Sequence, residues 1–221
     1  MMFEKRAMNL LFDLDGTLMD PFEGITKCIV HALVMLGRIA PPRESLRWCI
    51  GPPLKKSLAK LLASEDDQLA EEALAIYRDR FGSVGLFENK VYEDIPEVLD
   101  VLKEMRHTLY VATSKPAVYA ERIIDHFGLR RYFHGIYGSE LDGTRTDKTS
   151  LISHILQSES IASSEAVMIG DRKHDIIGAK ANAVLGLGVL WGYGNREELE
   201  ASGAYACIRQ PRELVSTWKY K

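Results

Sequence analysis

The sequence has few cysteines, no zinc-type histidine pair and no long apolar run. Its 221 residues include only three cysteines, Cys28, Cys49 and Cys207, and none of them forms a Cys-x-x-Cys pair. This pattern favours a reduced, cytoplasmic protein without a disulfide framework, in which each cysteine is a small buried hydrophobe. The six histidines contain no His-x-x-x-His pair, so we expect no zinc site.

Further absences exclude several classes of partner. The N-terminal residues carry charges but no apolar stretch long enough for a signal peptide. The most apolar segment, Ala183–Leu190, is far too short to span a bilayer, so we expect no membrane partner. A net charge of −3 and a pI of about 6.1 argue against nucleic acid as a partner, apart from a local basic patch. We find no internal repeat or low-complexity segment.

The composition is ordinary for a globular protein, and the pattern of expected secondary structure changes at about residue 85. Between 21 and about 85, helical periodicity and proline or glycine breaks predict helices only, with Asp20 and Ser64 as two of their N-caps. From 86 onward, strands and helices alternate, which indicates parallel strands with helices on both faces. We therefore expect an α/β fold: a Rossmann-like parallel sheet core formed by 1–20 and 86–221, with an α-helical cap domain, 21–85, inserted after strand one. The strands are expected at about Asn9–Phe12, Leu109–Thr113, around Ile136, and at Ala166–Ile169, Leu187–Leu190 and Ala206–Ile208.

Two aspartates directly follow the first expected strand. The apolar run 10–12 is typical of a buried parallel strand, and Asp13, Asp15 and Gly16 come next. Open α/β sheets bind ligands at the carboxyl ends of their strands. Carboxylates this close raise each other's pKa, and a divalent cation that prefers hard oxygen ligands, such as Mg²⁺, would relieve the repulsion. The residues alone also allow a simple acidic turn at Gly16.

The stretch Asp-Leu-Asp-Gly-Thr-Leu that begins at Asp13 resembles the first motif of the haloacid dehalogenase superfamily, most of whose members are phosphatases. Three further motifs follow in the family's order. The strand ending at Thr113 looks like motif two, Lys148 looks like motif three, and Asp171 with Asp175 looks like motif four. The resemblance covers nearly the whole chain, and its first and fourth motifs are the specific ones.

The resemblance implies a nucleophile, an acid and a metal site. Asp13 would attack the phosphoryl group and form an aspartyl phosphate. Asp15 would protonate the leaving alcohol and then activate the water that breaks the acyl phosphate. Mg²⁺ would be held by the Asp13 carboxylate, the Asp15 backbone carbonyl and Asp171, with Asp175 orienting a metal-bound water. Asp171 and Asp175 could instead be ordinary acids of a loop and a helix N-terminus.

Three more residues would contact the phosphoryl group. Thr113 and Ser114 would donate from the end of their strand, and Lys148 would supply a positive charge. On the residues alone, Thr113 and Ser114 could simply begin a helix, and Lys148 could be a solvent-exposed lysine at a helix start. Lys148 also departs from the family's commonest Lys-Pro, because Thr149 follows it.

Other stretches resemble one branch of the family. A Gly-Tyr-Gly at 192–194 is similar to the phosphoglycolate-phosphatase-like branch, and 50–54 and 138–143 resemble the bacterial 5′-nucleotidases within it. The expected substrate is therefore a nucleoside 5′-monophosphate, chosen by closure of the cap over the core.

Several cap residues could read the substrate. Trp48 and Phe22 could stack on a base, or they could belong to the interior of the cap. Lys55, with Arg47 and Lys56, could hold a carboxylate or a second phosphate, or could form a solvent-exposed helix face.

The alternatives within the family are a phosphoglycolate phosphatase or another small-metabolite phosphatase, a sugar-phosphate mutase and a dehalogenase. Asp15 counts against the dehalogenase, which needs no acid at that position. From another class, a phospho-accepting receiver module also combines acids, a hydroxyl and a lysine around Mg²⁺, but receivers are shorter and lack a cap. The expectation is thus a Mg²⁺-dependent phosphatase, monomeric or homodimeric, that acts on a small phosphomonoester.

Overall fold

The computed structural model describes residues 7–64 and 66–218. The first six residues, part of the stretch in which we expected no signal peptide, lie outside the described residues. The chain divides into two compact units, each described by itself: Asp20–Lys90, and Met1–Met19 together with Val91–Lys221. Within the described ranges, no helix has the length and apolar character needed to cross a membrane.

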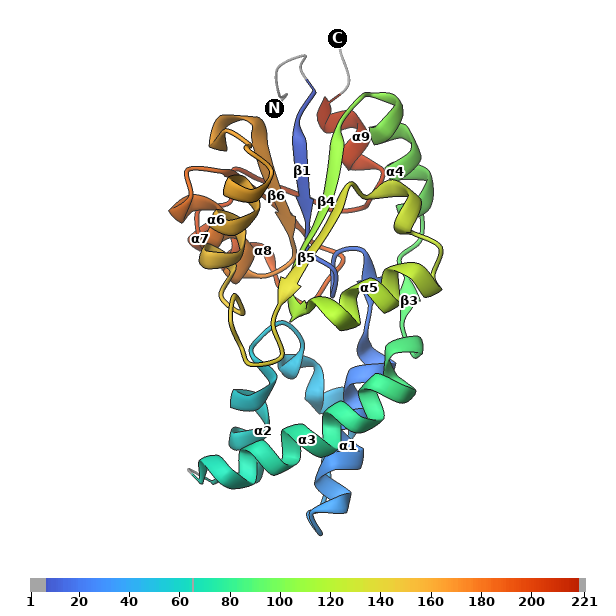
Figure 1. Cartoon of the computed structure of the whole chain (residues 1–221), viewed down its shortest axis with the longest axis vertical. Coiled ribbons are helices and arrows are strands. Elements are labelled where there is room, and N and C mark those ends of the chain that lie inside the picture. Colours follow the sequence, from blue (N-terminus) through green and yellow to red (C-terminus); the bar gives the residue numbers. More distant parts are fainter. Residues whose placement is uncertain (1–6, 65, 219–221) are drawn as a thin grey trace. The chain divides into compact units, whose positions relative to one another are not determined.

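The second of these units, the core unit, is built on a parallel sheet. Within the described residues its order is β5-β4-β1-β6-β7-β8, with β1 between β4 and β6 (Figure 1). The expected α/β fold with a parallel sheet is confirmed. The strands are β1 (Asn9–Phe12), β4 (Thr108–Pro116), β5 (Gly135–Ser139), β6 (Ala166–Gly170), β7 (Leu185–Val189) and β8 (Ala206–Ile208).

One strand, β4, is longer than the sequence indicated. It continues beyond Thr113 to Pro116, and its register with β5 shifts between Ala112 and Pro116. Thr113 therefore lies inside β4, and the expectation that it ends the strand is wrong. The three residues that follow it are polar or proline and lack the apolar pattern of a buried strand, so only the irregular pairing shows that the strand continues.

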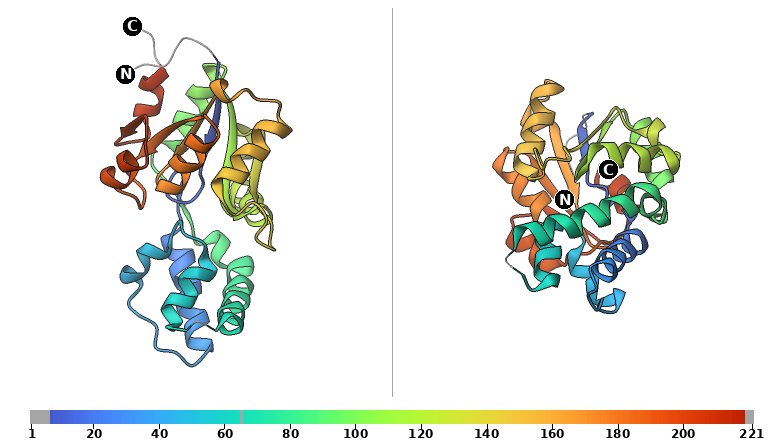
Figure 2. Two further views of the ribbon diagram at one scale, coloured as in Figure 1. Left: turned by 90° about the vertical axis from the view of Figure 1, so that its left-hand side faces the viewer. Right: turned by 60° about the horizontal axis from the view of Figure 1, so that its bottom comes forward.

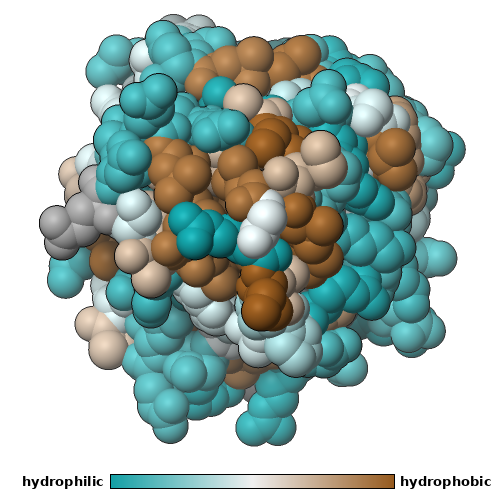
Figure 3. Space-filling view, turned by 90° about the horizontal axis from the view of Figure 1, so that it is seen from below, coloured by the Kyte–Doolittle hydropathy of each residue, from teal (hydrophilic) through white to brown (hydrophobic). Residues whose placement is uncertain are grey.

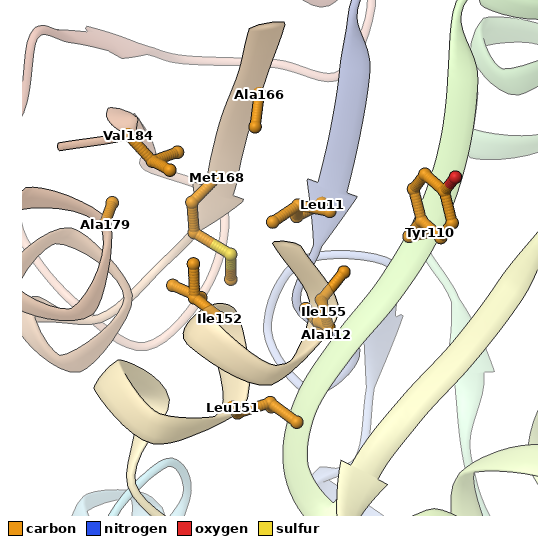
Figure 4. Packing of buried hydrophobic residues seen from close by; sticks show 10 residues of the cluster. All are labelled: Leu11, Tyr110, Ala112, Leu151, Ile152, Ile155, Ala166, Met168, Ala179 and Val184. Carbon is orange, nitrogen blue, oxygen red and sulfur yellow. The ribbon is translucent and has the colours of Figure 1, made fainter. Parts of the chain in front are cut away.

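Helices cover both faces of the sheet. Figure 4 shows one face, on which Leu151, Ile152 and Ile155 of α6 pack against Leu11 of β1 and Met168 of β6. On the other side lie α4 and α9, which pack against each other (Figure 1). The packing of α6 fixes the position of its first residue, Lys148. The helices of this unit are α4 (Ile95–Glu104), α5 (Ala117–His126), α6 (Lys148–Ser158), α7 (Lys173–Ala181), α8 (Arg196–Ala201) and α9 (Glu213–Trp218), with short 3₁₀ turns η3 (Arg130–Tyr132) and η4 (Ser163–Glu165).

The first unit, the helical unit, has α3 packed against both α1 and α2 (Figure 2). Its elements are α1 (Phe22–Met35), η1 (Arg43–Cys49), α2 (Leu54–Leu62), α3 (Asp67–Ser83) and η2 (Gly85–Phe87). Two short strands, β2 (Met19–Asp20) and β3 (Lys90–Val91), pair where the chain passes from one unit to the other. The apolar side chains of Val34, Met35 and Ile39 are exposed on this unit, and Figure 3 shows apolar residues gathered on the face seen from below.

Two expected N-caps are shifted by one or two residues. Asp20 lies one residue before the N-cap position of α1, although its carboxylate accepts the first backbone N–H of the helix at 3.0 Å. The N-cap of α3 is Asp66, which accepts from Gln68 N at 2.9 Å. Ser64, the expected cap, instead accepts from the Asp66 N–H. Short polar side chains next to each other compete for the same role, so the sequence does not resolve which one caps the helix.

The cysteines are free of disulfides in the described part of the chain. Cys28 and Cys49 are buried as expected, and burial raises the pKa of the Cys49 thiol to about 11. Cys207 is only half-buried, so the expectation of a buried cysteine is wrong at that position.

Candidate active site

Two strand ends bring Asp13 and Asp171 together. β1 and β6 are parallel neighbours with Phe12 opposite Ile169, and the backbone N–H of Asp13 donates to the Ile169 carbonyl at 2.9 Å. Asp171 follows directly after β6. The first residues beyond these two strands therefore lie at the same edge of the sheet, the edge where open α/β sheets bind ligands.

Asp13, Asp171 and Asp175 form an acidic cluster. One carboxylate oxygen from each residue lies within 4.8 Å of the other two, and all three residues are buried. Asp175 reaches the cluster from the first turn of α7, where its carboxylate also accepts the Arg172 backbone N–H at 3.1 Å. Grouped oxygen ligands of this kind suit a hard divalent cation.

Lys148 enters the same cluster from the start of α6. Its ammonium lies 2.8 Å from Asp13 Oδ1 and 2.7 Å from Asp175 Oδ1, and it donates to the Ala112 carbonyl at 2.6 Å. Burial alone would lower the pKa of Lys148, but the carboxylates of Asp13 and Asp175 raise it to about 12. The lysine is thus charged and almost fully buried, and the alternative of a solvent-exposed lysine is wrong.

Asp15 lies beside this cluster with a different partner. Its two carboxylate oxygens each lie 2.8 Å from Lys115 Nζ, and both side chains are largely buried. Burial raises the pKa of the Asp15 carboxyl, and Lys115 only partly opposes this. No motif in the sequence marks Lys115, because the strand was expected to end at Thr113. Its place two residues after Thr113 on an extended strand is the signal that could have revealed it, because alternate residues of a strand share a face.

The two carboxylate oxygens of Asp171 differ in their hydrogen bonding. Its Oδ2 accepts the Tyr193 backbone N–H at 2.8 Å, whereas its Oδ1 is buried without a hydrogen-bond partner among the described residues. Burial, and then the charges of Asp13 and Asp175, raise the pKa of Asp171 well above its ordinary value. A buried carboxylate in this environment is costly to ionise unless a positive charge lies close to it.

Gly16 allows the loop after β1 to approach Asp171. Its φ of +84° lies in the left-handed region, and a Cβ at this position would collide with the Asp171 carboxylate. Any larger residue would therefore displace Asp171 or the loop.

The two expected hydroxyl donors lie on β4. The Thr113 side chain is buried, and its Oγ1 accepts the Lys115 backbone N–H at 3.2 Å. Thr113 follows Ala112, whose carbonyl holds Lys148, so it lies next to the acidic cluster. The Ser114 backbone carbonyl accepts from Ser139 Oγ of β5 at 2.9 Å, which ties the two strands at this edge.

The aromatic residues expected to read the substrate lie in the helical unit. Trp48 is 39% exposed, and the Lys60 ammonium lies 4.6 Å from its ring centroid. Phe22 has the guanidinium groups of Arg43 and Arg47 at 5.7 and 5.5 Å from its ring centroid. Both rings therefore already bind cations of their own unit, and the exposed part of Trp48 stays accessible.

Lys55 is also engaged within the helical unit. Its ammonium lies 2.7 Å from Asp67 and 2.5 Å from Glu71 of α3. Two carboxylates around one lysine leave it little capacity for an anionic substrate. This pairing favours a structural role in joining α2 to α3.

Comparison with known proteins agrees with this geometry. The family model for haloacid dehalogenase-like hydrolases matches residues 10–189, a span that includes Asp13, Thr113, Lys148, Asp171 and Asp175. The chain belongs to this family. The expected resemblance and the assignment as a hydrolase are confirmed.

Relatives in the family carry several names. A 5′-nucleotidase of Pseudomonas aeruginosa is 50% identical over 196 residues, 89% of this chain and 88% of that protein. The tyrosine-protein kinase PtkA of Mycobacterium tuberculosis is 35% identical over 191 residues, 86% of this chain but 65% of the kinase. The crystal structure of a predicted phosphatase from Clostridium acetobutylicum is 42% identical with a TM-score of 0.90, over 95% of this chain and 97% of that one. Phosphoglycolate phosphatases match at lower identity, 26% in one case.

Proposed function

We propose that this hydrolase is a Mg²⁺-dependent phosphomonoesterase that uses Asp13 as its nucleophile and prefers nucleoside 5′-monophosphates. The observation that carries the proposal is the buried Lys148 ammonium between Asp13 and Asp175, at 2.8 and 2.7 Å, beside an Asp171 carboxylate whose Oδ1 has no partner among the described residues. A nucleophile for an anionic ester needs positive charge around it, because the phosphoryl oxygens repel an approaching carboxylate.

The residues present fit the Mg²⁺ that the family implies. Asp13, Asp171 and Asp175 bring three carboxylates, against which Lys148 brings one ammonium group. When all three are ionised, two negative charges of this cluster are left over, the charge of one divalent cation. Asp13 and Asp171 would hold the ion through their carboxylates and Asp15 through its backbone carbonyl, and Asp175 would orient its water. When bound, the ion would neutralise the charge of the phosphoryl oxygens during transfer.

In the first step, a carboxylate oxygen of Asp13 attacks phosphorus and the bond from phosphorus to the ester oxygen breaks. Lys148, and the Thr113 and Ser114 groups, stabilise the phosphoryl oxygens. Asp15 gives its proton to the leaving alcohol, a role suited to a carboxyl whose pKa burial raises. Its ion pair with Lys115 would hold the carboxyl in place and stabilise the carboxylate that remains.

In the second step, the Asp15 carboxylate takes a proton from water, and the water oxygen attacks phosphorus. The bond from phosphorus to the Asp13 oxygen breaks and its electron pair returns to the Asp13 carboxylate. Inorganic phosphate leaves, and both aspartates are again in their starting protonation states. The cycle consumes one water and needs no other reactant.

The substrate part of the proposal is supported by the 50% identity to a 5′-nucleotidase along 89% of the chain. The partly exposed Trp48 ring offers a surface on which any base can stack. Phosphoglycolate and other small phosphate esters are the alternative substrates, for which a carboxylate-binding cation in the helical unit would be needed. Arg47, Lys55 and Lys56 are the candidates for that cation; Arg47 lies 5.5 Å from the Phe22 ring centroid, and Lys55 is paired with Asp67 and Glu71.

The test is phosphate release from a panel of phosphomonoesters with Mg²⁺, with Ca²⁺ and with excess chelator. The proposal expects nucleoside 5′-monophosphates to give the highest kcat/KM, chelator to abolish turnover and Mg²⁺ to restore it. Ca²⁺ should restore little, because its larger and more flexible coordination disturbs in-line geometry. Full activity in chelator would rule out a required metal ion. A much higher kcat/KM for phosphoglycolate than for nucleoside 5′-monophosphates would make phosphoglycolate the proposed substrate instead.

A further inference from the structure

The segment between β7 and α8 holds the proposed metal ligand Asp171 from several sides. We define the clamp as residues Trp191–Glu198, which run from the end of β7 into the first turn of α8. No metal-binding or catalytic motif falls on the clamp in the sequence. It contacts the loop after β1, the Asp171 carboxylate and the start of α7, next to which α8 lies (Figure 1).

The first part of the clamp is anchored to the β1 loop. The Trp191 indole N–H donates to the Thr17 carbonyl at 3.0 Å, a contact between residues 174 positions apart. The next residue, Gly192, lies so close to Asp171 and to the Gly16 carbonyl that a Cβ would collide with both. The clamp therefore packs directly on the carboxylate, with no side chain between them.

The middle of the clamp binds one oxygen of Asp171. The Tyr193 backbone N–H donates to Oδ2 at 2.8 Å, and Oδ1 is left without a partner among the described residues. A carboxylate with one oxygen fixed by a backbone donor has its second oxygen oriented as well. Asp171 is a member of the acidic cluster, so this backbone donor fixes a carboxylate of that cluster.

The last part of the clamp holds the two residues that follow Asp171. Glu198 Oε1 accepts from Arg172 Nε at 2.9 Å and from the Lys173 backbone N–H at 2.8 Å. Burial would raise the pKa of Glu198, but these donors outweigh it and lower the pKa, so the residue is ionised. The clamp thus fixes the backbone on the carboxyl side of Asp171 as well as its side chain.

We infer that the clamp is a positioning device for the metal site, in which Trp191 and Glu198 act through Asp171 and set the affinity for Mg²⁺. This inference rests on the proposed function, since it concerns the Mg²⁺ site proposed there. Residues that orient metal ligands typically change metal affinity about 10–100-fold when they are replaced. Asp171 needs such support because repulsion from Asp13 and Asp175 would otherwise move its carboxylate away from the cluster.

The experiment measures Mg²⁺ binding by isothermal titration calorimetry on the full chain without substrate. Trp191→Phe removes the indole N–H and keeps an aromatic ring, and Glu198→Gln removes the charge at nearly constant shape. Ser83→Ala in the helical unit, which removes a side-chain donor to the Asp79 backbone carbonyl at 2.9 Å, is the control for the first change. Glu200→Gln is the control for the second, because Glu200 lies on the same helix and its pair with Arg196 at 2.8 Å is on the surface.

We expect Trp191→Phe and Glu198→Gln each to raise the Kd for Mg²⁺ by about tenfold or more, and the two controls to stay within about twofold of the wild type. Melting temperatures in chelator report folding separately. Unchanged Mg²⁺ affinity in both clamp variants would overturn the inference, even if their melting temperatures fell. If Trp191→Phe does not fold, Glu198→Gln decides the question by the same criterion.

Asp171→Asn separates this inference from the proposed function. If the wild type binds Mg²⁺ and Asp171→Asn does not, the metal site stands and the clamp variants alone decide the inference. If the wild type and Asp171→Asn bind Mg²⁺ equally, or not at all, the metal site itself is refuted and the inference falls with it.

Discussion

At the scale of single residues, two buried lysines distinguish two aspartates that are only two positions apart. Lys148 pairs with Asp13 and Lys115 pairs with Asp15. A nucleophile must stay ionised, whereas a general acid must carry a proton when the leaving group departs. Lys148, shared by Asp13 and Asp175, places a positive charge beside the proposed nucleophile, whereas the burial of Asp15 raises its pKa despite Lys115. The geometry thus supports different roles for the two carboxyl groups.

The assignment of Asp15 as acid predicts a dependence on the leaving group. An alkyl alcohol needs a proton as it leaves, whereas an activated phenol needs much less help. Asp15→Asn should slow single-turnover phosphorylation by an alkyl phosphate by about 10²–10⁴-fold, the usual contribution of general acid catalysis, and by an aryl phosphate far less. Asp125→Asn, an exposed change of the same kind, is the control. Equal losses with both esters would contradict the role.

A local pattern in the sequence marks the strand ends at which two of the expected site residues lie. Asp13 follows an apolar run and Asp171 follows another, so each could be placed at a strand end without knowledge of the fold. Trp191 and Glu198 could not be found in this way, because their partners lie 174 and 26 positions away in the chain. Lys115 was missed because the strand that carries it continues through a polar stretch ending in proline.

At the scale of elements, the site depends on three strands and one helix that are neighbours in space but far apart in sequence. β1 lies between β4 and β6, and α6 packs across them (Figure 4). This arrangement brings Asp13, Thr113, Lys148 and Asp171 to one edge of the sheet. Alternation of strands and helices predicted the parallel sheet, since parallel strands need a crossover connection, which is usually a helix. The ends of elements were less predictable, because cap positions and the irregular end of β4 depend on tertiary contacts.

A pH-sensitive hydrogen bond lies where β1 pairs with β4, away from the acidic cluster. His107, just before β4, is buried and accepts the Met8 backbone N–H at its Nδ1 at 3.1 Å, which requires an unprotonated ring nitrogen. Burial lowers the pKa of His107. The folded-state pKa is thus below the unfolded value of about 6.5. The contribution of neutral His107 to the free energy of unfolding is fully present above the unfolded-state pKa. It is lost as the pH falls through the folded-state pKa.

We therefore expect the melting temperature of the wild type to fall more steeply between pH 7.5 and pH 5 than that of His107→Gln. One proton costs at most about 1.4 kcal/mol per pH unit, which corresponds to a difference of a few degrees for a chain of this size. Thermal melts at several pH values in chelator make the measurement, and His126→Gln, an exposed histidine, should follow the wild type. Parallel curves for the wild type and His107→Gln would exclude His107 as the sensor.

At the scale of the whole molecule, the chain combines a core unit that carries the acidic cluster with a helical unit that carries Trp48. The sequence showed the two patterns through the change from helices alone to alternating strands and helices. That the helical unit acts as a cap stays a prediction. If it does, the chemistry and the choice of substrate reside in different units and can be changed separately.

This separation predicts a selective effect of Trp48→Ala. Loss of a stacking partner costs about 1–3 kcal/mol per base, so kcat/KM for nucleoside 5′-monophosphates should fall by roughly tenfold to a hundredfold. A small substrate without a base, such as acetyl phosphate, should be hydrolysed as before. Val84→Ala, which changes another partly exposed apolar residue of the same unit, is the control. An equal loss on both substrates would mean that Trp48 supports the helical unit and does not read the base.

The central claim is that Asp13 becomes phosphorylated during turnover. A lost nucleophile lowers turnover by far more than a hundredfold in typical cases, so Asp13→Asn should be inactive while keeping its melting temperature within a few degrees. Inactivity alone, however, does not show a covalent intermediate. The intermediate should accumulate in Asp15→Asn, which lacks the group that activates the hydrolytic water.

The most direct measurement is an acid quench of Asp15→Asn after it reacts with a ³²P-labelled aryl phosphate and Mg²⁺, followed by peptide mapping. The account predicts a base-labile label on the peptide that contains Asp13, approaching one phosphoryl group per chain, and no label in Asp13→Asn/Asp15→Asn. Hydrolysis of the ester without any label on the protein, or a label on another residue, would contradict it.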